Sequence, residues 1–138
     1  MSLISLIENL KNNGYVIEND EYKSTDCSFL IHRAKKGKIF SKKLLIIEID
    51  DFQNVNFNKI VSAVKMINKK NDSCIALCHC DEISNELKSK TLYMTDNGDG
   101  VCLIHFVYYD ENKNFTYDLD FSYYQSKIVK NAILELVA

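Results

Sequence analysis

Two acidic side chains, Glu48 and Asp50, close the apolar run that begins at Leu44, and Asp51 follows directly. An almost unbroken apolar run is typical of a strand that is buried on both faces. Residues two apart in a strand point to the same side, so Glu48 and Asp50 leave the strand on one face. Two such carboxylates repel unless a cation lies between them, and hard divalent cations take oxygen ligands. The pattern indicates a candidate metal site, with solvated acids at a strand end as the alternative.

Hydrophobic periodicity and turn residues predict the elements that position these acids. Helices are expected over 2–13, from Asn56 or Asn58 to about Lys70, over 82–89 and over 123–137; strands over 15–18, 27–33, 44–50, 74–80, 91–95, 101–109 and 115–121; and turns at 19–21 and 34–43. A strand, a helix and a second apolar strand in succession favour parallel pairing. The sequence therefore predicts one α/β domain over residues 1–138, with a mixed central sheet flanked by helices.

The predicted topology brings a third acid, Asp26, close to Glu48 and Asp50. Asp26 stands at the entrance of the strand over 27–33, which the 34–43 hairpin joins to the strand carrying Glu48. Antiparallel neighbours bring the start of one strand beside the end of the next. We therefore expect Asp26, Glu48 and Asp50 to converge at one end of the sheet.

This arrangement resembles the PD-(D/E)xK nuclease superfamily, the restriction-endonuclease-like fold, over roughly residues 3–107. In that family an Asp at the second strand and an acidic-x-Lys motif at the third hold Mg²⁺ and activate water. Asp26 matches the first acid and Glu48 the second. The resemblance implies metal-dependent phosphodiester hydrolysis, with Mg²⁺ or Mn²⁺ held by Asp26, Glu48 and Asp50. Glu8 is similar to an acid that some members carry on the first helix.

The chain departs from the family motif at its lysine. Asp50 occupies that position, and Thr25 replaces the proline that precedes the first acid. A lysine there orients the attacking water and offsets developing charge. Either Lys65, on the following helix, is a relocated catalytic base, or the chain is a catalytically degenerate relative.

The expected 34–43 hairpin is basic, with Arg33, Lys35, Lys36 and Lys38 around Gly37. These side chains are candidates for contacts with nucleic-acid phosphates, and a solvated turn is the alternative. The net charge of −2 excludes a protein that binds nucleic acid through bulk positive charge. A nucleic-acid partner would therefore depend on this local patch.

A second function class is a non-enzymatic protein-binding module, such as an immunity protein, an adaptor or a secretion-chaperone-like homodimer. Aromatic residues are concentrated late in the chain, from Phe106 to Tyr124. Most fit cross-strand pairs, and the others could form a patch for a partner. A chaperone-like protein would need an exposed hydrophobic groove rather than an acid cluster.

Five cysteines without a secretory signal favour reduced thiols. In a strand, Cys74, Cys78 and Cys80 share one face, which favours core cysteines over a zinc site.

No apolar run reaches 18 residues, so we expect no membrane span. The first residues lack a basic segment followed by an apolar one, and a cytoplasmic location is the resulting expectation.

Overall fold

The structure is a computed structural model that describes residues 3–25, 27–37, 42–52, 56–68, 72–96, 101–110, 112 and 115–116. Its elements, in chain order, are α1 (Leu3–Asn12), β1 (Val16–Lys23), β2 (Ser28–Lys36), β3 (Lys42–Ile49), α2 (Phe57–Ile67), β4 (Ser73–His79), α3 (Asn85–Lys88), β5 (Leu92–Asp96), β6 (Val101–Tyr109) and β7 (Phe115–Thr116). Within these residues, no helix is both long and apolar enough to cross a membrane.

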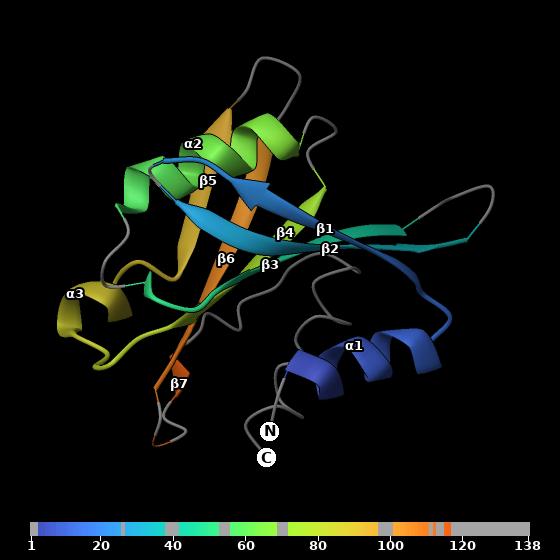
Figure 1. Ribbon diagram of the computed structural model, residues 1–138, viewed down its shortest axis with the longest axis horizontal. Helices are drawn as coiled ribbons and strands as arrows, with labels where there is room; N and C mark the ends of the chain where they lie inside the picture. The colour runs from blue at the N-terminus through green and yellow to red at the C-terminus, as the bar shows by residue number, and fades with distance from the viewer. Residues whose placement is uncertain are drawn as a thin grey trace.

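The strands form one mixed sheet in the order β1-β2-β3-β4-β6-β5, and β7 also pairs with β6. The first three strands are an antiparallel meander. β4 is parallel to β3, and β6 is parallel to β4. The predicted mixed α/β sheet, with a meander followed by a helix and a parallel strand, is confirmed (Figure 1).

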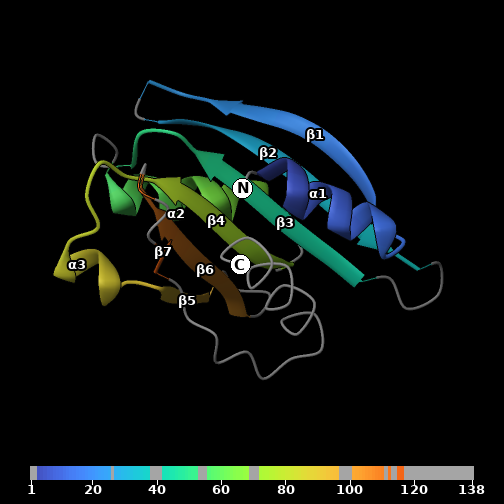
Figure 2. The same ribbon diagram turned by 90° about the horizontal axis from the view of Figure 1, so that it is seen from below.

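The two longer helices lie on opposite faces of the sheet, as Figures 1 and 2 show. On the α2 side, Ile47 of β3 packs in one cluster with Ile60 and Val64. On the α1 side, Leu44 and Ile46 pack in a second cluster with Leu10. Alternate residues of β3 thus enter two different cores. This double burial explains why β3 is a nearly unbroken apolar run.

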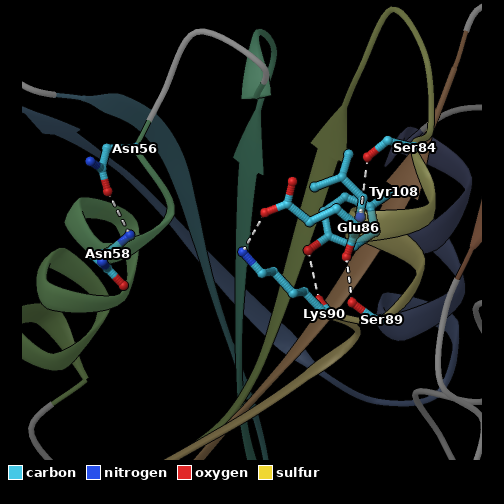
Figure 3. A network of polar contacts seen from close by, with 8 residues as sticks. Asn56, Asn58, Ser84, Glu86, Ser89, Lys90 and Tyr108 are labelled. Carbon is cyan, nitrogen blue, oxygen red and sulfur yellow. Dashed lines mark hydrogen bonds and ion pairs between the residues drawn. The ribbon is translucent and has the colours of Figure 1, made fainter.

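The ends of α2 are set by asparagine side chains. Asn56 Oδ1 accepts a hydrogen bond from the backbone N–H of Asn58 at 2.9 Å, which satisfies a donor in the first turn (Figure 3). Asn68 ends the helix, and its side chain exchanges two hydrogen bonds with the backbone of Asp72, at 2.8 and 2.9 Å. The helix therefore ends at Ile67, before the expected Lys70.

The helix expected over 82–89 is confined to the single turn α3. Its cap is Ser84, whose Oγ accepts from the backbone N–H of Leu87 at 3.3 Å. The Lys90 ammonium pairs with Glu86 at 3.1 Å, and the Lys90 carbonyl accepts from the Tyr108 hydroxyl at 2.6 Å (Figure 3). The Tyr108 hydrogen bond fastens the connection after β4 to β6, and the other two contacts lie within that connection.

The prediction of a turn at 19–21 is wrong, because β1 continues through these residues. β1 pairs with β2 along its whole length, from Val16 opposite Lys35 to Lys23 opposite Ser28. Tyr22 stacks on Phe29 with ring centroids 4.9 Å apart, which ties the far half of β1 to the sheet.

The hairpin between β2 and β3 is also shorter than predicted, since β2 extends to Lys36 and β3 begins at Lys42. Most of the strand expected over 115–121, and the helix expected over 123–137, lie outside the described residues.

Candidate functional site

The end of β3 lies beside the start of β2, with Glu48 directly opposite Leu30. A groove of about 450 Å³ follows this junction. It is lined from β3 and its exit by Glu48, Asp50 and Asp51, and from the entrance of β2 by Ser24, Thr25 and Cys27, among others. The predicted meeting of these two strand ends is confirmed. Asp26 itself lies outside the described residues, although both of its neighbours in the chain line the groove.

Glu48 lies on the α1 face of the sheet, in a row of polar side chains that crosses the meander. Its Oε2 is 3.7 Å from Nε2 of His32 on β2, and the two side chains are only 20% and 13% exposed. His32 lies directly opposite Asn19 of β1. The Asn19 Oδ1 accepts from His32 Nδ1 at 2.7 Å. Three adjacent strands therefore contribute one side chain each to the row Asn19–His32–Glu48.

The surroundings of Glu48 change its acidity. Burial raises the pKa of the Glu48 carboxyl above its ordinary value, and the Asp50 carboxylate raises it further by repulsion. His32 opposes both effects by its charge and by hydrogen bonding. The end of β3 thus holds a half-buried carboxyl group that binds its proton more tightly than a solvated glutamate.

The carboxyl ends of the parallel strands β4 and β6 contribute to the same place. His79 Nδ1 donates a hydrogen bond to the Asp50 carbonyl at 3.1 Å. The His79 ring packs edge-on against the Tyr109 ring, with the ring centroids 5.2 Å apart. Burial, and then the nearby carboxylates of Glu48 and Asp50, raise the pKa of Tyr109 to about 12. Ligands of open α/β sheets bind outside the carboxyl ends of such strands.

The structure does not bring Lys65 to this site, so the relocated base suggested by the sequence is corrected. Lys65 is in the last turn of α2, which packs on the face of the sheet opposite Glu48. That turn also lies at the other end of the strands, because the carbonyl of Ile67, two residues after Lys65, accepts a hydrogen bond from Arg33 at 3.2 Å. Glu8 is on α1, the helix on the correct face, and its side chain is exposed.

The basic residues around the hairpin do not form one patch. Arg33 reaches the end of α2, and Lys35 lies two residues further along β2 on that same face. Lys36 points to the α1 face, where its Nζ lies 5.8 Å from the centre of the Tyr15 ring. The single phosphate-binding loop expected from Arg33, Lys35, Lys36 and Lys38 is therefore divided between two faces, and Lys38 lies outside the described residues.

A larger hollow of about 1080 Å³ lies at the hairpin end of the sheet. Its lining includes the cationic side chains Arg33, Lys35 and Lys43 and the exposed apolar side chains Val16 and Met66. Its acidic lining residues are Glu18 and Asp72. This hollow is a mixed surface of both charges rather than a second carboxylate site.

The cysteines behave as predicted for core residues. Cys74, Cys78 and Cys80 are buried in the hydrophobic cluster beneath α2. Burial raises the pKa of Cys78 well above its ordinary value and that of Cys80 to about 11, so both thiols stay protonated at neutral pH. In the part of the chain that the structure describes, no three His, Cys, Asp or Glu side chains are grouped closely enough to hold a metal ion. A complete metal site at Glu48 therefore requires a ligand such as Asp26.

Sequence reasoning missed the site residues Asn19, His32, His79 and Tyr109. The alternation along β2 places His32 on the face opposite Phe29 and Ile31, which are core residues on the α2 side. That signal assigns His32 to the same face as Glu48 once the two strands are paired. Asn19 carried no such signal, because its neighbours resemble a turn.

The chain matches no protein-family model, and no curated protein and no solved structure is significantly similar to it.

Proposed function

We propose that the protein is a divalent-cation-dependent hydrolase of nucleic-acid phosphodiester bonds, with its site at the carboxyl end of β3. The observation that carries the proposal is the groove in which Glu48 and Asp50 meet the two residues that flank Asp26. The succession of a meander, a crossover helix and a parallel strand also supports the proposal, because the resemblance to the nuclease superfamily rests on that arrangement.

Two carboxylates of this groove fit a hard divalent cation in their chemistry. Glu48 and Asp50 lie near enough for Asp50 to raise the Glu48 pKa, and a cation between them would replace this repulsion with attraction. Asp26 would be the third ligand. A bound divalent cation supplies activation of water and neutralises charge on the scissile phosphate.

The other residues of the site position these ligands. His32 holds the Glu48 side chain from the neighbouring strand. His79 holds the Asp50 backbone through its carbonyl. Lys36 also lies on this face, at the hairpin end, and its charge would attract a phosphate of a bound strand.

The test is cleavage of labelled single- and double-stranded DNA and RNA in Mg²⁺ or Mn²⁺. We expect cation-dependent cleavage that falls at least 100-fold in Glu48→Gln, with Glu18→Gln as the matched control at the other end of the sheet. Chelator should abolish the wild-type activity. No cleavage of any substrate, or equal cleavage by both variants, would reject the proposal.

Partner binding is the second candidate, and the hollow at the hairpin end favours it. Val16 and Met66 line this hollow with 71% and 64% of their surface exposed, beside Arg33 and Lys43. Exposed apolar side chains surrounded by charged residues are typical of protein-binding surfaces. An inactive protein with an intact fold would direct attention to this surface.

A further inference from the structure

Three cationic side chains line the hollow at the hairpin end, on the α2 face of the sheet. Lys35 of β2 is directly opposite Lys43 of β3, and Arg33 lies two residues before Lys35 on the same face. Residues that are directly opposite have their Cβ atoms about 4.5–5.5 Å apart, and like charges at such positions are destabilising. Within the described residues, none of the three cations forms an ion pair. An anionic group bound among them would replace this repulsion with attraction.

The acidic side chains of the hollow lie at the margins of this cationic cluster. Glu18 is opposite Arg33 on the edge strand β1, and Asp72 leads into β4, on the far side of Lys43 from β2. The positive charge is therefore concentrated around Lys35, whose two cross-strand neighbours are an apolar residue and a lysine. A long polyanion such as nucleic acid would meet both acids, whereas a single compact anionic group fits between them.

Apolar side chains lie beside this charge in the same hollow. Val16 is directly opposite Lys35, and Met66 lines the hollow from α2; both side chains are largely exposed. The volume of about 1080 Å³ is close to the upper end of the range for small-molecule sites, about 300–1,000 Å³. Such sites combine apolar walls with a few polar groups that orient the ligand. This lining therefore suits a ligand with an anionic head and an apolar body.

We propose that the hollow binds a small anionic amphiphile, a molecule with one carboxylate, sulfonate or phosphate group on an apolar body. The anionic group lies at Lys35 and Lys43. The apolar body lies against Val16 and Met66. This site goes beyond the proposed hydrolase, because it is on the other face of the sheet and at the other end of β3 from Glu48. It also gives the hollow an occupant other than a protein partner, and the test separates the two.

The test is fluorescence titration of the full chain with anilinonaphthalene sulfonate, a dye with an apolar body and one anionic group. Phenylnaphthylamine, which lacks the sulfonate, is the neutral counterpart. We expect saturable binding of one sulfonate dye per chain, and binding of the neutral dye that is weaker by about tenfold or more. Decanoate should displace the sulfonate dye and shift the amide resonances of Val16, Lys35 and Lys43.

Variants assign the two parts of the ligand to their side chains. Lys35→Gln should weaken binding of the sulfonate dye about tenfold and leave binding of the neutral dye unchanged. Lys36→Gln is the matched control, since the next residue of β2 carries the same charge on the opposite face, near Tyr15. It should bind both dyes as the wild type does. Met66→Ser should weaken the binding of both dyes.

Two results would overturn the proposal. Equal binding of the two dyes, or equal losses in Lys35→Gln and Lys36→Gln, would mean that the dyes report exposed apolar surface only. No saturable binding of the sulfonate dye, together with unshifted amide resonances in decanoate, would leave a protein partner as the occupant to seek. Neither result bears on the hydrolase, which cleavage by Glu48→Gln tests separately.

Discussion

The two ends of β3 carry opposite charges, and the structure builds them in different ways. At the carboxyl end, Glu48 and Asp50 lie on one face with His32 and Tyr109 around them. At the amino end, the basic residues alternate between faces, so that Arg33 supports α2 while Lys36 packs near Tyr15. The six residue steps from Lys42 to Glu48 separate these ends by about 20 Å. Ionisable side chains are gathered on one face at the carboxyl end and divided between the two faces at the amino end.

The strongest test of this contrast is at Arg33. Its half-buried guanidinium donates to the Ile67 carbonyl at the end of α2, where a positive charge also favours the helix. We expect Arg33→Ala to lower the free energy of unfolding by about 1–2 kcal/mol, measured by urea denaturation. Lys35→Ala, at an exposed position on the same strand, should cost less than about 0.5 kcal/mol. Equal losses would mean that Arg33 is an ordinary surface cation.

A smaller effect is expected at Glu48 in the metal-free protein. Because the folded-state pKa is raised, the folded protein binds this proton more tightly than the unfolded chain. Wild-type stability should therefore fall as the pH rises from the ordinary value of 4.5 through the raised pKa, and then level off. Glu48→Gln removes this loss.

At pH 7, in the presence of chelator, Glu48→Gln should be more stable than the wild type by up to about 1 kcal/mol. The gain should disappear below pH 4.5. Denaturation at both pH values measures it, and Glu18→Gln at the hairpin end provides the baseline for an exposed acid. A gain that persists at low pH would show that the raised pKa of Glu48 is not its source.

The features that depend on β3, namely its neighbours in the sheet and the acids at its end, could be predicted from the sequence. Its apolar run, the crossover through α2 and the parallel β4 follow from burial on both faces. So does the position of Glu48 and Asp50 at the strand exit. These features depend on local pattern and on connection rules, which a single sequence contains.

The row Asn19–His32–Glu48 could not be predicted, because it depends on strand pairing that no local sequence pattern specifies. Asn19 belongs to an exposed edge strand whose polar residues show no alternation, so the segment resembles a turn. Lys65 was assigned to the site because no pattern states which face of the sheet a helix covers. The division between Lys35 and Lys36 follows from strand alternation, and was missed because β2 was ended at Arg33.

The most direct test of the central claim is nuclear magnetic resonance of the ¹⁵N-labelled protein during addition of substoichiometric Mn²⁺. Paramagnetic broadening decreases steeply with distance, so it locates the ion on the fold. If the cation binds at the carboxyl end of β3, the amide signals of Glu48, Asp50 and His79 are lost first, while those of Lys35 and Met66 remain sharp. Broadening that begins at the hairpin end, or that affects the whole chain equally, would show that no cation binds between Glu48 and Asp50.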